Sequence, residues 1–79
     1  MFSFQPRWKE ELIVSVADGS FMLELAGSPL IAALPTEERW RERVPTWAKE
    51  LWPQLHLELA AWCQENNVTL AVEATAQVY

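Results

Sequence analysis

The sequence has little of what most small catalytic, metal-binding and disulfide-bonded proteins depend on. Its 79 residues include one cysteine, one histidine and two glycines. Cys63 cannot form an internal disulfide, and small secreted domains usually carry several, so a reducing compartment is favoured. One Cys and one His cannot supply a closed zinc site without carboxylates, and two glycines cannot make a phosphate-binding loop. We therefore predict no cofactor and no metal.

Basic residues are also scarce. Six Lys and Arg stand against eleven Asp and Glu, so the net charge is −5 and the computed pI is about 4.7. Nucleic-acid affinity comes largely from Lys and Arg that neutralise phosphates. The composition therefore argues against a nucleic-acid partner and favours a protein partner with a basic surface, met by electrostatic steering.

Long apolar runs are missing as well. The longest uncharged stretch begins at Leu25 and ends before Glu37, and it contains Gly27, Pro29 and Pro35. This stretch is too short and too interrupted to span a bilayer. The first residues lack a basic segment followed by a long apolar core, so they do not resemble a signal peptide. We expect a soluble, cytoplasmic protein without a membrane partner.

Apolar and aromatic residues are abundant by contrast. They make up 51% of the chain and include five tryptophans and three phenylalanines. A chain of this length buries only about 60% of its unfolded surface, so large side chains must supply most of the core. We predict one domain over residues 1–79.

The helical region is predicted over residues 36–67. A short helix begins at Thr36 as cap, has Trp40 and Val44 on its apolar side, and ends before Pro45. The main helix runs from Thr46, its predicted cap, to Asn67. Its apolar stripe consists of Trp47, Leu51, Leu55, Leu59, Trp62 and Cys63.

Pro53 leaves two alternatives for the main helix. A proline inside a helix removes one backbone hydrogen bond and crowds the carbonyl four residues earlier. The helix is therefore either kinked but continuous, or a separate helix begins at Pro53. The apolar stripe keeps its phase across the proline, which favours the continuous helix.

A β-hairpin is predicted over residues 11–26, with Asp18-Gly19 as a type I′ turn. This turn places Val14 opposite Leu23 and puts the large apolar side chains on one face. The other face carries Ile13, Ser15, Met22 and Glu24. Residues 68–78 alternate throughout and predict a C-terminal strand.

Two segments remain open. Residues 1–10 form an arm whose Phe2, Phe4 and Trp8 pack against the core or, alternatively, grip a partner; Pro6 interrupts strand pairing. Residues 28–34 form either a short helix capped by Ser28 or an extended connection.

The predicted fold is α+β with β-β-α-β order. A three-stranded sheet, made of the hairpin and the C-terminal strand, packs on the main helix with the short helix before it.

Catalytic chemistry finds little support in the sequence. His56 and Cys63 lie on one helix, about 10 Å apart along its axis at about 1.5 Å per residue. A Cys–His dyad needs contact at about 3 Å, so an enzyme or small-molecule binder that uses Cys63 and His56 is the least favoured hypothesis. A stacked contact with Trp52 accounts for His56 more simply than a role as metal ligand.

The tryptophans point to binding instead. Trp40 lies among Arg39 and Arg43, and Trp and Arg are enriched at binding hot spots. We take Trp40, Arg39, Arg43, Trp52 and His56 as candidate partner-binding residues, against the alternative that these rings build the core. The outer sheet face with Ile13 and Met22 is a second possible contact surface.

The leading hypothesis is a small acidic, non-catalytic protein-binding module of the immunity, antitoxin or inhibitor type. The alternative is a homodimer or a small accessory subunit of a larger complex.

Overall fold

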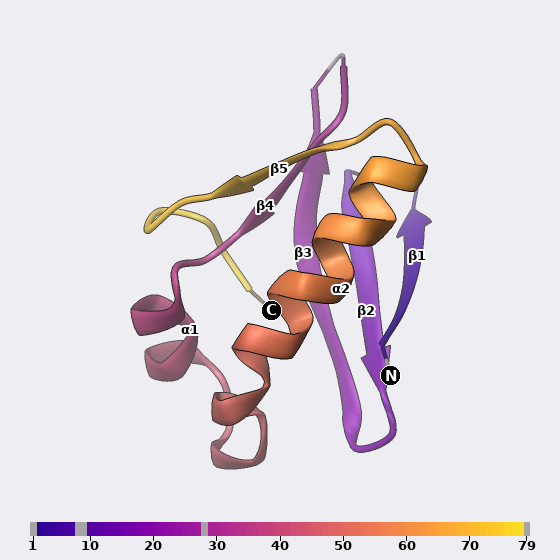
Figure 1. Cartoon of the computed structure of the whole chain (residues 1–79). Coiled ribbons are helices and arrows are strands. Elements are labelled where there is room, and N and C mark those ends of the chain that lie inside the picture. Colours follow the sequence, from indigo (N-terminus) through magenta and orange to yellow (C-terminus); the bar gives the residue numbers. More distant parts are fainter. Residues whose placement is uncertain (1, 8–9, 28, 79) are drawn as a thin grey trace.

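The computed structural model describes residues 2–7, 10–27 and 29–78, which form an α+β fold with one sheet. The strands are β1 (Ser3–Arg7), β2 (Glu11–Val16), β3 (Gly19–Ala26), β4 (Ile31–Leu34) and β5 (Thr69–Val72). They lie in the order β1-β2-β3-β4-β5, and only β4 and β5 are parallel (Figure 1). The predicted class is confirmed. The three-stranded sheet is wrong because β1 and β4 are also strands.

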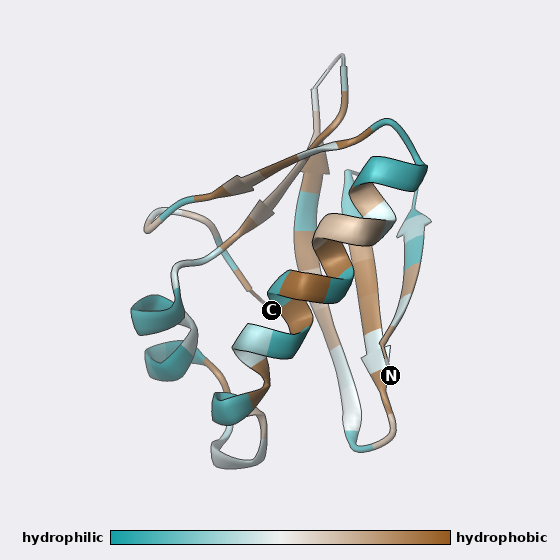
Figure 2. Cartoon of the chain, viewed as in Figure 1, coloured by the Kyte–Doolittle hydropathy of each residue, from teal (hydrophilic) through white to brown (hydrophobic). Residues whose placement is uncertain are grey.

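The helices all lie between β4 and β5 in the chain. They are α1 (Glu37–Arg43), the 3₁₀ helix η1 (Thr46–Leu51) and α2 (Trp52–Glu65). Helix α2 lies across the face of β2 and β3 (Figure 1). Apolar residues gather where the helix and these strands face each other (Figure 2). No helix in the described part of the chain is long and apolar enough to cross a membrane.

The core is formed by this apolar layer. Its buried members come from both the sheet and the helical region: Leu12, Val14, Phe21, Leu23, Leu25, Ala32, Leu34, Trp40, Val44, Ala48, Leu55, Leu59, Cys63 and Val68.

The hairpin is present, but its register differs from the prediction. Val14 lies opposite Phe21 rather than Leu23, and Val16 lies opposite Gly19. The shift is two residues, and because side chains alternate with period two, every side chain stays on its predicted face. The loop residues are Ala17 and Asp18, and neither has the positive φ that a type I′ turn requires.

The N-terminal residues form strand β1 rather than an arm outside the sheet. Phe4 lies opposite Val14 and Pro6 opposite Leu12. Proline is tolerated here because β1 is an edge strand, where one side of the backbone needs no ladder partner. Phe2 and Phe4 pack against the core as expected. Trp8 lies outside the described residues.

Phe2, just before β1, is also tied to α2. The Phe2 N–H donates to Glu58 Oε1 at 2.9 Å, and this hydrogen bond lowers the pKa of the Glu58 carboxyl. The contact fixes β1 beside the helix that covers the sheet.

The segment before α1 is extended. It forms β4, in which Ala32 and Leu34 are buried and Ile31 is exposed, and Leu30 before the strand is exposed too. The short-helix alternative is therefore wrong. Ser28, its proposed cap, lies outside the described residues. The next helix follows the prediction: Thr36 Oγ1 accepts a hydrogen bond from the Arg39 N–H at 3.4 Å, and the chain becomes extended at Val44.

The main helix is divided. Residues 46–51 form η1, and Pro53 occupies the first turn of α2, where the missing N–H has no helical partner to lose. The continuous helix is therefore wrong, and Thr46 makes no capping hydrogen bond. The far end is as expected, because Asn67 has φ of 58° and the Val68 N–H donates to the Cys63 carbonyl at 2.9 Å.

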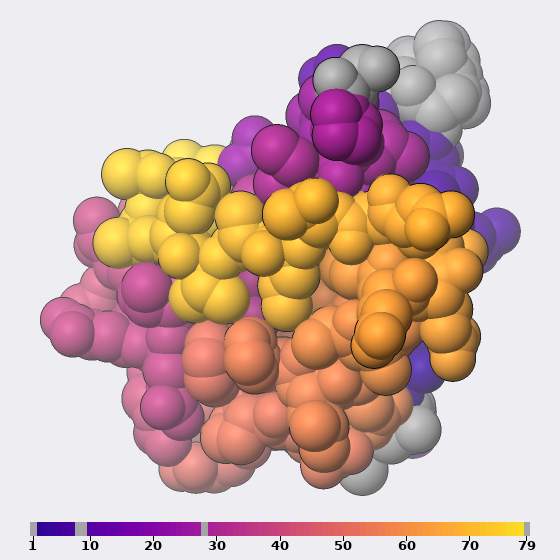
Figure 3. Space-filling view, turned by 45° about the horizontal axis from the view of Figure 1, so that its top comes forward, coloured from indigo at the N-terminus to yellow at the C-terminus, as the bar shows by residue number. Residues whose placement is uncertain are grey.

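The C-terminal strand is shorter than predicted and lies elsewhere. β5 ends at Val72 and pairs with β4, not with the hairpin. The chain then turns, and Val78 forms an isolated antiparallel bridge with Leu23 in β3. Figure 3 shows these last residues lying on the surface, against β5 and the segment that contains α1.

Candidate partner-binding site

Trp40 is a core residue. Its side chain is completely buried, and its Nε1–H donates to the Ala48 carbonyl at 2.9 Å. Its ring meets the Phe21 ring edge-on at a centroid distance of 4.9 Å. The expectation that Trp40 is exposed for a partner is wrong, because α1 turns its apolar side towards the sheet.

Two of the three arginines on α1 are engaged in ion pairs. Arg39 lies 3.1 Å from Glu42 on the same helix. Arg41 forms two hydrogen bonds with the Glu50 carboxylate, at 3.2 and 2.8 Å, which raise the pKa of Arg41 above its ordinary value and join α1 to η1. Arg43, by contrast, makes no ion pair or side-chain hydrogen bond with any described residue.

Trp47, and not Trp40, is partly exposed at the surface. It is 43% exposed, although the sequence pattern places it in the buried stripe. Its ring lies 5.5 Å from the Phe21 ring and covers Gly19 so closely that a Cβ there would be 2.9 Å from it. Gly19 thus serves close packing of the indole rather than a left-handed turn.

Trp47 and Arg43 line one pocket of about 240 Å³, between the start of β3 and the junction of α1 and η1. We call it the Arg43–Trp47 pocket; its lining residues are Ser20, Phe21, Arg43, Val44, Pro45, Trp47 and Val78. Its walls are mainly apolar, and Arg43 supplies a positive charge. Such a pocket can hold an apolar side chain and offer hydrogen bonds to an acceptor beside it.

Trp52 and His56 form a separate contact. Their rings stack at a centroid distance of 5.0 Å with an interplanar angle of 11°. The Trp52 Nε1–H donates to the Pro35 carbonyl at 2.8 Å, which holds α2 against the end of β4. The stacking predicted for His56 is confirmed, and neither residue lines the Arg43–Trp47 pocket.

Cys63 lies in the core and is only 2% exposed. Burial raises the pKa of its thiol and so disfavours the reactive thiolate. Among the described residues, no group of three His, Cys, Asp or Glu side chains is placed to hold a metal ion.

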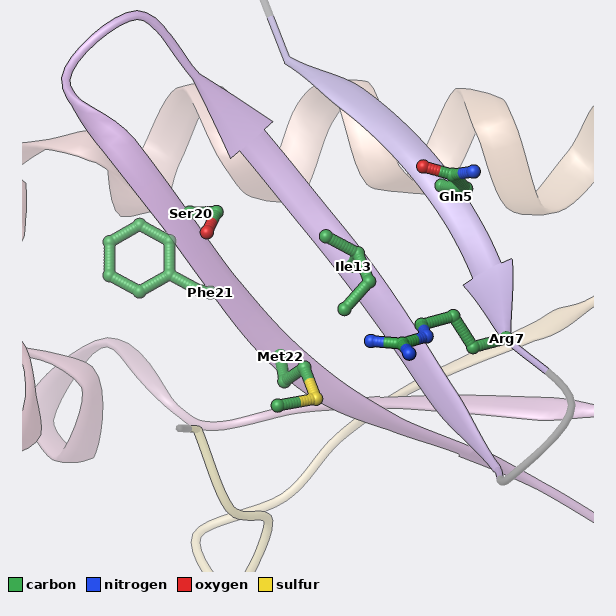
Figure 4. Close-up of a pocket in the computed structure, with 6 residues that line it drawn as sticks. All are labelled: Gln5, Arg7, Ile13, Ser20, Phe21 and Met22. Carbon is green, nitrogen blue, oxygen red and sulfur yellow. The ribbon is translucent and has the colours of Figure 1, made fainter.

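The outer face of the sheet carries a second depression, of about 620 Å³ (Figure 4). Ile13 and Met22 lie opposite each other there, on the face predicted for them. Arg7 and Gln5 of β1 flank this apolar floor, and the Arg7 side chain extends towards Ile13 (Figure 4). This face lies on the other side of the sheet from α2.

The sequence patterns missed Trp47 because helical periodicity alone assigned it to the core. Pro45 and Pro53 bracket the segment from Thr46, and two prolines so close were the available signal that a regular helix would not form there.

Comparison with protein-family models, with curated proteins and with solved structures finds no match to this chain.

Proposed function

We propose that the protein is a non-catalytic protein-binding module that engages its partner through the Arg43–Trp47 pocket. One observation carries the proposal. An indole that is 43% exposed is packed on the buried Phe21 ring beside an arginine without an ion-pair partner among the described residues. Trp and Arg are the residue types most enriched at interface hot spots, and here they share one concave site.

The site is preorganised for binding. Trp47 rests against the Gly19 backbone and the Phe21 ring, which are two residues apart on the same face of β3. A side chain that is already ordered loses little conformational freedom when a partner covers it, and a rotamer-rich side chain would lose about 0.5–1.5 kcal/mol. Trp47 can therefore contribute its apolar contact area at a small entropic cost.

Charge suggests the kind of partner. The chain carries a net charge of −5, so a basic protein would be attracted over long range. At short range Arg43 needs an acceptor group on that partner. An immunity, antitoxin or inhibitor type of role, in which a small acidic chain covers a basic target, fits both requirements.

The test compares matched surface variants in a binding assay. Partners are crosslinked in the native host, identified, purified and titrated against wild type, Trp47→Ala and Arg43→Ala. Leu57→Ala is the control, because Leu57 is 65% exposed on α2 and does not line the pocket. We expect about a thirtyfold or greater loss of affinity for Trp47→Ala, as for a hot-spot residue, and no change for the control. Equal affinity of Trp47→Ala and wild type for every stoichiometric partner rules the proposal out.

A second candidate function is self-association through the outer edge of β5. This strand ends the sheet among the described residues, and Val72 on it is 41% exposed. An unpaired edge strand is a template for pairing with another copy. Sedimentation at micromolar concentration distinguishes the two: a monomer at all concentrations excludes the dimer, whereas a dimer that Val72→Lys dissociates supports it.

A further inference from the structure

Strand β3 has a partner along only part of the edge that faces β4. Residues 24–26 pair with β4, and Leu23 is bridged by Val78. From Gly19 to Met22 no described strand pairs with this edge, because β4 ends at Leu34 and the chain leaves towards α1.

The hydrogen-bonding phase of the sheet shows which groups point to this open edge. The Leu25 N–H donates to the Glu10 carbonyl on the β2 side at 3.0 Å. In an antiparallel ladder, alternate residues direct both their N–H and C=O to the same neighbour. The backbone N–H and C=O of Phe21 and Leu23 therefore point to β2. Those of Ser20 point to the open edge.

The open edge and the Arg43–Trp47 pocket adjoin each other. Ser20 and Phe21 belong to both, and the Phe21 side chain lies on the helix side of the sheet with Leu23. A residue placed opposite Phe21 in an added strand would direct its side chain to that same side, into the pocket. Backbone pairing and side-chain insertion can therefore be made by one short segment.

The chain itself shows that an extended segment fits this place. Val78 lies antiparallel to β3 at Leu23 and also lines the pocket, and the Gln77 N–H donates to Glu24 Oε1 at 3.3 Å. A single bridge is a weak attachment, since it lacks the repeated bonds of a ladder. In a strand that follows this antiparallel register, the residue two positions after the one opposite Leu23 would lie opposite Phe21.

We propose that the partner docks by strand addition: an extended peptide segment pairs antiparallel with Gly19–Leu23 and takes the place of Val78 on β3. It inserts apolar side chains opposite Leu23 and Phe21 and presents a carboxylate to Arg43. Five residues of strand span about 17 Å at roughly 3.4 Å each. Main-chain hydrogen bonds supply affinity and the pocket supplies selectivity, as in other strand-addition complexes. This inference rests on the proposed function of the Arg43–Trp47 pocket.

The test separates the backbone of Ser20 from its side chain. A displayed library of random linear peptides is selected on the wild-type protein, and the enriched peptides are synthesised and titrated. Ser20→Pro removes the N–H that points to the open edge and leaves the β2–β3 ladder intact, so folding should survive. We expect about a tenfold or greater loss of affinity for Ser20→Pro. Ser20→Ala keeps the backbone N–H and changes only a side chain on the Met22 face of the sheet, so its loss should be several times smaller. Hydrogen exchange at the Ser20 amide should slow when the peptide binds.

The outcomes distinguish the two proposals. Peptides or native partners that lose affinity with Trp47→Ala but not with Ser20→Pro overturn strand addition and leave the pocket as the binding site. Binding that neither variant changes overturns both. A selection that yields no peptide also overturns strand addition. If Ser20→Pro does not fold, a chain synthesised with N-methylserine at position 20 removes the same N–H and decides the question.

Discussion

Two tryptophans contact the same phenylalanine, yet only one belongs to the core. Trp40 meets Phe21 at 4.9 Å and is completely buried, whereas Trp47 meets it at 5.5 Å and is 43% exposed. The Trp40 indole N–H is bonded to the Ala48 carbonyl, and the Trp47 indole N–H has no partner among the described residues. A buried indole needs such a partner, and a surface indole does not.

The difference shows how one aromatic cluster can serve both stability and binding. Phe21 is the shared support: its buried ring holds Trp40 on the core side and Trp47 on the pocket side. The same residue type therefore has a structural role in α1 and, in our proposal, a recognition role in η1. The following predictions would break or sharpen this distinction.

Trp40→Ala should have the largest effect. Replacing a buried tryptophan by alanine costs about 3–5 kcal/mol, and a chain of this size has a total stability of only about 4–12 kcal/mol. Thermal and urea denaturation should show a protein that is mostly unfolded or close to it. Trp40→Phe should cost less, because it keeps the ring but leaves the Ala48 carbonyl without its donor. A Trp40→Ala protein as stable as wild type contradicts the assignment of Trp40 to the core.

The rate at which a thiol reagent labels Cys63 should also distinguish Trp40→Ala from Trp47→Ala. The thiol is 2% exposed and burial raises its pKa, so reaction with a thiol reagent requires the core to open. A loss of about 3 kcal/mol in Trp40→Ala makes opening, and hence labelling, about a hundredfold faster. Trp47→Ala should label at close to the wild-type rate. Rapid labelling of the wild-type protein shows instead that Cys63 is accessible in the native state.

Trp47→Ala should reduce stability by only about 1–2 kcal/mol, because roughly half of the ring is already in water. The same change should cause the large loss of partner affinity described above. Denaturation and titration of one purified variant measure both quantities. A stability loss as large as that of Trp40→Ala, with affinity retained, would reverse the roles assigned to the two rings.

Gly19→Ala should have the smallest effect, about 1 kcal/mol or less, because the new Cβ pushes a movable indole away from the strand. The sign should reverse in the Trp47→Ala background. There the clash is gone, and replacing glycine stabilises by about 0.4–1 kcal/mol through the unfolded state. A double-mutant cycle measures this coupling, and additive effects would mean that Trp47 does not rest on Gly19.

The local features were predictable where neighbouring residues decide them. Thr36 caps α1, Asn67 ends α2 in the left-handed conformation, and the hairpin residues lie on their predicted faces. The faces were correct even though the register was shifted by two, because alternation depends only on odd or even position. The contact of Gly19 with Trp47, a residue distant in the chain, is not visible in the hairpin sequence.

The strands β1 and β4 were missed for a different reason. Pro6 argues against pairing in general, and only its place at the sheet edge makes it acceptable. Ile31–Leu34 is too short to show a clear strand pattern in the sequence. It becomes a strand because it pairs with β3 on one side and β5 on the other. Neither neighbour is visible in the local sequence.

By itself, the sequence determined the α+β class, the hairpin and the boundaries of α1. These follow from periodicity, capping and turn chemistry, which act over a few residues. Only the tertiary structure decided which tryptophan is buried, because both Trp40 and Trp47 contact the Phe21 ring, and only Trp40 is also enclosed by the core and bonded to the Ala48 carbonyl. Long-range packing therefore selected the exposed ring on which the proposed function rests.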